Sequence, residues 1–280
     1  MQILTTIGDF RAVRAKIRST GSLGLVPTMG YLHDGHLELV RRARVTNGIV
    51  AVSIFVNTTQ FGPDEDLLSY PRDVERDQAL LEKAGCDLLF YPAVEEMYPP
   101  GGGDVYILPG ELATVLEGAS RPGHFRSVAT VVAKLFNIVQ PETAYFGQKD
   151  GQQLAVIRRM VRDLDFPVEI VAVPTVREAD GLAMSSRNTY LSPDERSGAT
   201  VLYRALMRAQ ELHLGGEKDA EVLRAAVFDV LASEPLVAAD YVSIADDETL
   251  EELDLVDADA MVSLAVRIGR TRLIDNVLLG

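Results

Sequence analysis

Apolar strand-like runs alternate with amphipathic helical stretches over the first part of the chain. Ile49 to Val56 is almost wholly apolar and rich in β-branched residues, which is typical of a strand buried on both faces. Further strands are predicted at residues 22–27, 87–91, 144–146 and 168–173, and helices at 8–20, 35–46, 71–84, 126–139 and 150–164. Strands that alternate with helices predict an α/β fold with a doubly wound parallel sheet.

The pattern changes after about residue 176. The elements expected there are helices at 193–213 and 218–233, joined at Gly215-Gly216, and strands at 240–244, 260–268 and 271–276. Helices followed by strands predict a smaller α+β domain. We therefore expect a Rossmann-like domain at residues 1–176 and an α+β C-terminal domain at 177–280.

Polar residues follow three of the predicted strands, at the point where each strand ends. These residues are His33 and His36, Asn57 and Gln60, and the run Gln148-Lys149-Asp150. Ligands of doubly wound sheets bind at the carboxyl ends of the strands. The three junctions together therefore predict a ligand site at that edge of the sheet.

The two histidines stand where a strand gives way to a helix. Free backbone N–H groups and the positive end of the helix dipole favour an anion at such a point. Two imidazoles there could hold a phosphate and protonate it as charge develops, and Gly35 between them lets backbone approach a ligand. Two other interpretations stay open: helix-capping histidines, or a zinc site, for which the chain has only four His and one Cys.

The glycine-led run from Gly181 to Asn188 is a second candidate phosphate site. Its serine hydroxyls, backbone N–H groups and the Arg187 guanidinium suit a phosphate, although a surface loop that caps the next helix has the same composition. Lys149 at a strand end can neutralise phosphate as well. Arg121 and His124 either add positive charge or belong to a solvated lead-in to a helix.

Composition and charge narrow the class of protein. The formal net charge of −14 over 280 residues argues against nucleic acid as a partner, and no apolar run is long enough to span a bilayer. The single cysteine, Cys86, excludes an intrachain disulfide and has the context of a small core residue. The first ten residues do not resemble a signal peptide, so we expect a cytoplasmic protein that binds neither nucleic acid nor membrane.

The histidine turn and the late serine–arginine loop together are typical of HxGH nucleotidylyltransferases, and no GxGxxG fingerprint of a dinucleotide-binding domain is present. Over essentially its whole length the chain resembles the pantothenate synthetase (pantoate–β-alanine ligase) family. The resemblance is carried by Pro27-Thr28-Met29-Gly30, His33-Asp34-Gly35-His36, Ser53 to Asn57 with Gln60-Phe61, Tyr70-Pro71-Arg72, Glu117-Gly118, Arg121 to Phe125, Phe146 to Asp150, Gln152-Gln153-Leu154, Met184 to Asn188, and Arg272 to Asn276.

The resemblance implies a homodimeric, Mg²⁺-requiring enzyme that converts pantoate, β-alanine and ATP into pantothenate, AMP and pyrophosphate through pantoyl adenylate. It implies an ATP site formed by Met29, Gly30, Tyr31, Leu32, His33, Asp34, Gly35, His36, Gly147, Gln148, Lys149, Asp150, Val176, Met184, Ser185, Ser186 and Arg187. It also implies catalytic roles for His36, the proton donor, and for His33, Lys149 and Arg187. By the same matching, Gln60 and Gln153 hold pantoate, Gln60 also contacts β-alanine, and the C-terminal domain partly covers the site.

Two positions depart from the family pattern: Thr58 stands where the family usually has proline, and Gly151 where it usually has an aromatic residue. We expect the first to loosen the loop that carries Gln60, and the second to remove a packing group beside Gln153. The Mg²⁺ ligands cannot be assigned from the sequence. Asp73, Glu75 and Asp77 are acidic candidates, but a solvated helix face is the preferred interpretation.

Three other functions are compatible with the same motif residues. One is a nucleotidylyltransferase that stops after adenylyl transfer, and another is a nucleotide sensor without catalysis. A sensor function does not explain why Gln60, Gln153 and Lys149 are present together with the two histidines. A class I tRNA synthetase is disfavoured by the acidic charge.

Overall fold

The computed structural model describes residues 1–18, 21–62, 65 and 67–280. The chain forms two compact units. Unit 1 consists of Met1–Gly147 and Val156–Val173, and unit 2 of Gln148–Ala155 and Pro174–Gly280.

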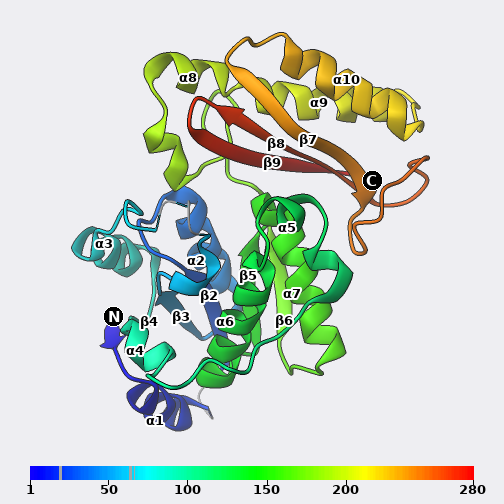
Figure 1. Ribbon diagram of the computed structural model, residues 1–280. Coiled ribbons are helices and arrows are strands. Elements are labelled where there is room, and N and C mark those ends of the chain that lie inside the picture. Colours follow the sequence, from blue (N-terminus) through cyan, green and yellow to red (C-terminus); the bar gives the residue numbers. More distant parts are fainter. Residues whose placement is uncertain (19–20, 63–64, 66) are drawn as a thin grey trace. The chain divides into compact units, whose positions relative to one another are not determined.

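Unit 1 contains a six-stranded, wholly parallel sheet in the order β1-β4-β3-β2-β5-β6 (Figure 1). Its strands are β1 (Gln2–Leu4), β2 (Leu23–Thr28), β3 (Ile49–Ile54), β4 (Leu88–Phe90), β5 (Thr143–Gly147) and β6 (Glu169–Val173). Its helices are α1 (Ile7–Ile17), α2 (Asp34–Thr46), α3 (Val74–Ala84), α4 (Val94–Met97), α5 (Leu116–Ser120), α6 (His124–Val139) and the greater part of α7 (Gly151–Asp163). The predicted doubly wound α/β sheet is thus confirmed.

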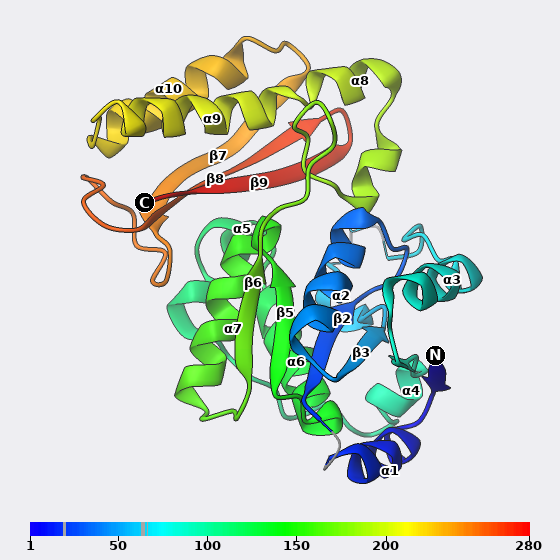
Figure 2. The ribbon, with the colours of Figure 1, turned by 180° about the vertical axis from the view of Figure 1, so that it is seen from behind.

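The strand order reverses between β2 and β5. β2 pairs with β3 from Leu23↔Ile49 onward on one side, and with β5 at Gly24↔Thr143 on the other. Figure 2 shows the β5 side of the sheet from behind, with β6 at its edge. A ligand crevice in such a sheet forms where the order reverses, outside the carboxyl ends of the two diverging strands. Thr28 and Gly147 are these ends, and within unit 1 the segment that follows Thr28 is placed for binding.

The core of unit 1 explains why these runs form strands. Val26, Val50, Val52 and Leu89 are fully buried between helices, and Cys86 belongs to the same cluster. Burial also raises the pKa of the Cys86 thiol to about 12, which leaves it protonated and unreactive, as expected for a core residue.

One helix start differs from its expected position. Helix α3 begins at Val74 rather than at Pro71, because the Asp73 carboxylate caps it by accepting a hydrogen bond from the Arg76 backbone N–H at 3.1 Å. It ends at Gly85 in the left-handed conformation, as the sequence predicts.

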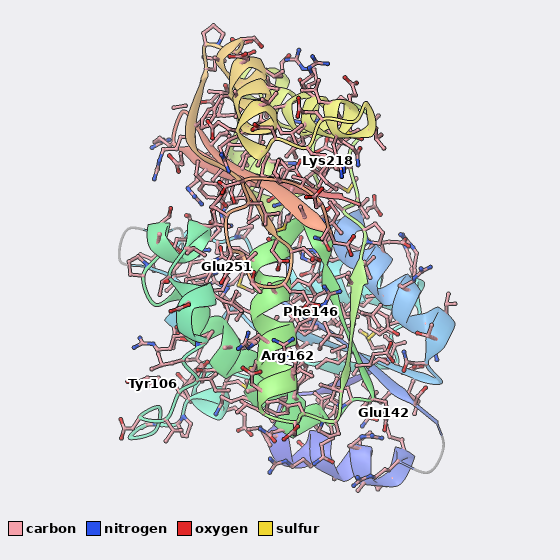
Figure 3. The ribbon with its side chains drawn as sticks, turned by 90° about the vertical axis from the view of Figure 1, so that its right-hand side faces the viewer. Tyr106, Glu142, Phe146, Arg162, Lys218 and Glu251 are labelled. Carbon is pink, nitrogen blue, oxygen red and sulfur yellow. The ribbon has the colours of Figure 1, made fainter. Side chains whose placement is uncertain are left out.

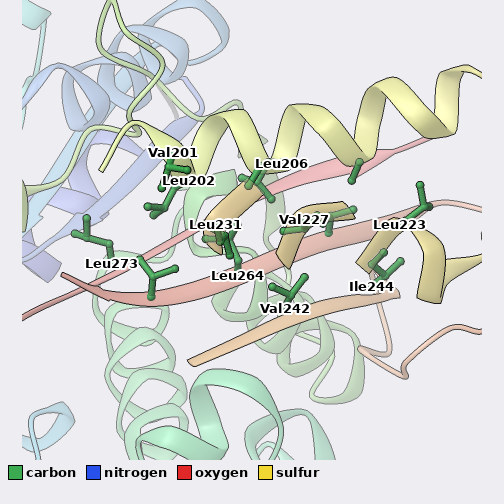
Figure 4. Close-up of a cluster of buried hydrophobic side chains, with 14 of the residues drawn as sticks. Val201, Leu202, Leu206, Leu223, Val227, Leu231, Val242, Ile244, Leu264 and Leu273 are labelled. Atoms are coloured by element: carbon green, nitrogen blue, oxygen red, sulfur yellow. The ribbon is translucent and has the colours of Figure 1, made fainter. Parts of the chain in front are cut away.

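Unit 2 contains an antiparallel sheet in the order β7-β8-β9, formed by β7 (Val237–Asp246), β8 (Ala260–Ile268) and β9 (Thr271–Leu279). Its other helices are α8 (Pro193–Gly198), α9 (Val201–Leu214) and α10 (Ala220–Ala232). Leu206, Val227, Leu231 and Leu264 form the apolar layer between the helices and the sheet (Figure 4). The helices-then-strands pattern therefore gives the small α+β unit that the sequence predicts.

The single helix expected at 193–213 is two helices. Gly198 ends α8, and the next backbone hydrogen bonds span three residues: Thr200 N–H to Ser197 O, and Leu202 N–H to Ala199 O. Glycine is a weak helix former, so the break falls at this point. A search of the described residues finds no helix with the length and apolar character needed to cross a membrane.

Candidate active site

The histidine turn, Met29 to His36, begins where β2 ends. Gly30 has φ +87° and Tyr31 has φ +51°, so the chain turns sharply before α2 starts at Asp34. A β-carbon at Gly30 would also lie only 3.0 Å from Ile54 and 3.2 Å from Asp77, which is tighter than ordinary contact and adds to the strain of the positive φ. The turn therefore requires this glycine.

Asp77 on α3 holds the turn in place. Its side chain is buried, and it accepts hydrogen bonds from the backbone N–H groups of Tyr31 at 2.6 Å and Leu32 at 2.8 Å. Burial raises the pKa of Asp77, and these two hydrogen bonds oppose the rise. Arg76 adds a hydrogen bond to Leu32 O at 3.0 Å and covers the Tyr31 ring. The expectation of a solvated acidic face is therefore wrong at Asp77, which faces the histidine turn.

The two histidines cap α2. His33 is the N-cap residue, and Nδ1 of His36 accepts a hydrogen bond from the His33 backbone N–H at 3.3 Å. Their ring centroids lie 4.0 Å apart. Because Nδ1 of His36 is an acceptor, a neutral His36 ring carries its proton on Nε2. The capping interpretation is thus correct in geometry, and it leaves His36 with a proton to donate.

Gln60 contacts the same turn from η1, a 3₁₀ helix at Thr58–Gln60. Its Nε2 donates to Met29 Sδ at 3.0 Å, and its Oε1 accepts from Asn57 Nδ2 at 3.1 Å. Asn57 is buried and also accepts from the Tyr98 hydroxyl at 3.0 Å. Two of the residues predicted from the sequence, Met29 and Gln60, are therefore in direct contact.

Arg121 and His124 do not form a region of free positive charge, so the first of the two interpretations left open by the sequence is wrong. Arg121 makes a bidentate ion pair with Glu65, at 2.7 Å for each bond. Burial first, and the Arg121 charge second, lower the pKa of His124 to about 4, so this histidine is neutral at pH 7. Arg121 donates to His124 Nε2, so His124 Nδ1–H donates to the Gln60 carbonyl at 3.0 Å and supports the Gln60 backbone.

A cavity of about 740 Å³ lies at the carboxyl ends of the strands of unit 1. Met29, Gly30 and Tyr31 form part of its wall, together with residues that follow β1, β3 and β4. Its volume falls in the range of small-molecule pockets. The histidine turn therefore borders a space large enough for a ligand.

In unit 2, η3 (Gln148–Asp150) is held by β9. Asn276 Nδ2 donates to the carbonyl oxygens of Gln148 and Lys149, at 2.9 Å each, and Gln148 Nε2 donates to Asn276 Oδ1 at 3.3 Å. Lys149 Nζ lies 3.4 Å from the carbonyl oxygen of Ile274.

The segment before the serine–arginine loop is a short hairpin from Val176 to Met184. Met184 N–H donates to Val176 O at 3.0 Å, and Gly181 turns with φ +93° against the Tyr203 ring. The hairpin is anchored by Arg177, whose guanidinium donates to both carboxylate oxygens of Asp275 at 2.6 and 3.0 Å. Asp275 is 2% exposed, so this is a buried, bidentate ion pair.

Ser185 is the N-cap residue of η4 (Ser186–Tyr190), and its hydroxyl accepts a hydrogen bond from the Arg187 backbone N–H at 3.3 Å. The helix-capping interpretation is therefore correct for Ser185. Lys149, Ser185 and Asp275 also line one small void of about 10 Å³. Unit 2 thus gathers Lys149 and Ser185, two residues from separate motifs.

Gly151 is not a packing defect, contrary to the expectation. A β-carbon at Gly151 would lie 2.4 Å from Met261 Sδ and 3.2 Å from Asn276 Nδ2. The space of the usual aromatic residue is therefore taken by Met261. Gln153 lies half-buried on the first turn of α7.

Sequence reasoning missed the part that four residues play in these sites. Asp275 and Asn276 had no assigned role, Asp77 was named only as a candidate Mg²⁺ ligand, and His124 only as a source of positive charge or part of a solvated lead-in. His124, Asp275 and Asn276 lie within motifs that carry the resemblance, so a signal was present. Asp77 lies within a predicted helix, and no local pattern indicated that it anchors the histidine turn.

These features define the class: an α/β protein of the HxGH nucleotidylyltransferase type, with its histidine turn directly after a strand beside the point where the strand order reverses. The family model described as pantoate-beta-alanine ligase matches residues 2–278. The chain belongs to this family, and it is therefore an enzyme, a ligase.

Relatives with assigned names support the same family assignment. The chain is 62% identical to the pantothenate synthetase of Roseiflexus castenholzii over 279 residues, which cover 100% of this chain and 99% of that protein. It is 62% identical to the Chloroflexus aurantiacus (strain J-10-fl) pantothenate synthetase over 280 residues, covering 100% and 98%.

Solved structures of similar proteins support the family assignment as well. A crystal structure of pantothenate synthetase from Thermus thermophilus matches with a TM-score of 0.93 at 54% identity, covering 99% of both chains. The pantoate-beta-alanine ligase of Francisella tularensis, solved in complex with beta-gamma ATP and beta-alanine, matches with a TM-score of 0.81 at 35% identity, covering 99% of this chain and 97% of that one.

Proposed function

We propose that the chain joins pantoate to β-alanine at the expense of ATP, through a pantoyl-adenylate intermediate. The observation that carries the proposal is the family match over residues 2–278. In the first step a pantoate carboxylate oxygen attacks the α-phosphorus of ATP and pyrophosphate leaves. In the second step the β-alanine amine attacks the acyl carbonyl, loses a proton and releases AMP.

The first step needs groups that meet the charge that grows on pyrophosphate. His36 is the proton donor in this proposal, and His33 lies beside it as a phosphate-binding partner. Lys149, Ser185, Ser186 and Arg187 supply an ammonium, two hydroxyls and a guanidinium for the same charge. The remaining ATP-binding residues, from Met29 to Asp34 and at Gly35, Gly147, Gln148, Asp150, Val176 and Met184, are proposed from the resemblance.

Gln60 and Gln153 are proposed to hold pantoate, and Gln60 also β-alanine. Both are neutral amides, which orient a carboxylate without the strong ground-state stabilisation that an arginine would give. The Gln60 Nε2 donor rests on Met29 Sδ, a weak acceptor. A substrate oxygen can replace that sulfur at small cost, which supports the assignment of Gln60.

Mg²⁺ is proposed to arrive bound to ATP, because phosphate oxygens are ordinary ligands of this ion. Within the described residues, no three His, Cys, Asp or Glu side chains are grouped to hold a metal. Asp73 and Asp77, two of the candidate ligands, are used as a helix cap and as the anchor of the histidine turn.

A homodimer and a cytoplasmic location are proposed as well. Val105 and Leu108, in the segment before η2 (Gly110–Ala113), are 89% and 70% exposed, and Tyr106 beside them lies at the outside of unit 1 (Figure 3). Such exposed apolar side chains suit contact with a second copy. Leu108→Asp is expected to shift sedimentation from dimer to monomer.

The proposed cytoplasmic location rests on the cysteine content. The single, buried thiol suits a reducing compartment.

One assay tests the reaction. The protein is mixed with Mg²⁺, ATP, pantoate and β-alanine, and AMP, pyrophosphate and the amide are measured. Pyrophosphate without amide would instead favour an enzyme that stops after adenylyl transfer, and ATP binding without pyrophosphate would favour a sensor.

Gln153→Ala tests the proposed pantoate site. It is expected to raise the KM for pantoate more than the KM for ATP, and equal rises in both would contradict the assignment of Gln153.

A further inference from the structure

Strand β9 provides contacts to both phosphate-binding segments of unit 2. β9 is an edge strand, and within the described part of the chain its sheet partner is β8 alone. The groups on its other side are therefore available for contacts outside the sheet. The backbone carbonyls of Ile274 and Asn276 use this freedom, accepting from Lys149 and Arg177, and the side chains of Asp275 and Asn276 add further contacts to the same segments.

Asn276 fixes the peptide from which the Lys149 side chain leaves. The residue is 4% exposed, and its amide donates to two successive carbonyls and accepts from the Gln148 side chain. Only an amide supplies two donors and an acceptor in this way, because a carboxylate accepts alone. The position therefore requires the hydrogen-bonding groups of asparagine, and a side chain of the same volume without them would not replace it.

Asp275 fixes the base of the hairpin that leads to Ser185. Its bidentate pair with Arg177 is supported by the Tyr203 ring, which lies 4.2 Å from the guanidinium carbon. Asp275 and Arg177 neutralise each other in charge. The pair therefore places the hairpin without adding to the charge that would attract a phosphate.

We propose that Asp275 and Asn276 are positioning residues for the adenylyl-transfer step. They act through Arg177 and Lys149, and they hold Lys149 and the Ser185–Arg187 segment in the arrangement that receives ATP. The inference rests on the proposed function, in which both segments bind ATP. Misplacement of binding groups by about 1 Å can cost about 10²-fold in rate, so loosening this anchor should be visible in the ATP constants.

The decisive variant is Asn276→Asp, which keeps the side-chain shape and removes both donors. Its KM for ATP is expected to rise about tenfold or more, whereas its KM for β-alanine, assigned to Gln60 in unit 1, stays within about twofold. Arg177→Lys keeps the charge but loses the paired bonds, and it is expected to raise the ATP KM in the same direction by less.

Asp240→Asn is the matched control. It removes a carboxylate of the same sheet whose ion pairs are with Arg267 and with Arg272 of β9, at 2.7 Å for the latter, and wild-type constants are expected. Thermal unfolding of each variant reports whether it is folded. If Asn276→Asp fails to fold, the KM for ATP of the Arg177→Lys variant is used to test the proposal instead.

The proposal is overturned if folded Asn276→Asp, or folded Arg177→Lys where it decides, keeps the wild-type ATP KM. It is also overturned if the KM for β-alanine rises equally, or if Asp240→Asn has the same effect, because a general loosening of the sheet would then be the cause. If the wild-type protein forms no amide, the proposed function fails separately, and calorimetric ATP binding to the same variants still tests the positioning role.

Discussion

The histidine turn of unit 1 and the two segments of unit 2 that are proposed to bind phosphate, Gln148–Asp150 and Ser185–Arg187, are held in different ways. The turn is capped by His36 within itself and anchored by Asp77, 46 residues from Tyr31 in the chain. The segments of unit 2 are anchored by Asp275 and Asn276, at separations of 98 and 128 residues. A motif can therefore be visible in the sequence while the side chains that place it are far away.

The largest expected effect separates the chemistry of the turn from its support. His36→Ala should lower kcat by about 10²–10³, the usual result of removing one transition-state donor. Its unfolding should change little, because the capping bond that His36 accepts from the His33 backbone is long and weak. Pyrophosphate release measures the rate, and His213→Ala, a change in unit 2, is the control. Near-wild-type release would remove His36 from the reaction.

Asp77→Ala tests the anchor of the turn. Two buried N–H groups would lose their acceptor, which is expected to cost about 2–4 kcal/mol of unfolding free energy. Asp73→Ala removes the side-chain cap at the start of α3 and should cost about 1 kcal/mol. Urea unfolding compares the two variants. An equal loss in both would mean that the turn does not depend on Asp77.

The histidine that supports the Gln60 backbone, His124, can be tested by the pH dependence of stability. Its folded pKa of about 4 lies below the unfolded value of 6.5, so the unfolded chain binds the proton first. Its contribution to stability is complete above pH 6.5 and is lost as the pH falls toward 4, by up to about 3 kcal/mol. His124→Gln should flatten the dependence of unfolding free energy on pH in this window. An unchanged slope would contradict a neutral His124.

The smallest expected effect concerns the loop that carries Gln60. Thr58→Pro restores the residue usual in the family and should stabilise the protein by about 0.4–1 kcal/mol, because it restricts the unfolded chain. Thermal unfolding measures this gain, and the KM for pantoate shows whether the loop also binds better. Destabilisation would mean that the backbone at Thr58 does not suit proline.

Much of the fold followed from the sequence because its signals are local. Short apolar runs predicted β2, β3, β5 and β6, and Gly85 and Gly215 ended helices where expected. The break between α8 and α9 was missed, because a single Gly198 inside an apolar pattern is a weak signal. Gly151 was misjudged for a different reason: its neighbour Met261 is more than a hundred residues away in the chain.

The sequence by itself determined the class of sheet, the position of the histidine turn after β2, and the residues proposed to handle phosphate and substrate. The sheet and the turn follow from periodicity and short motifs, which are properties of neighbouring residues, whereas the residues proposed for substrate binding follow from the resemblance to the family. Only the tertiary structure decided that Asp77 anchors the turn, that His124 is neutral, and that Asp275 and Asn276 hold two motifs together. Burial and long-range hydrogen bonds arise only when distant segments pack together, so no local pattern records them.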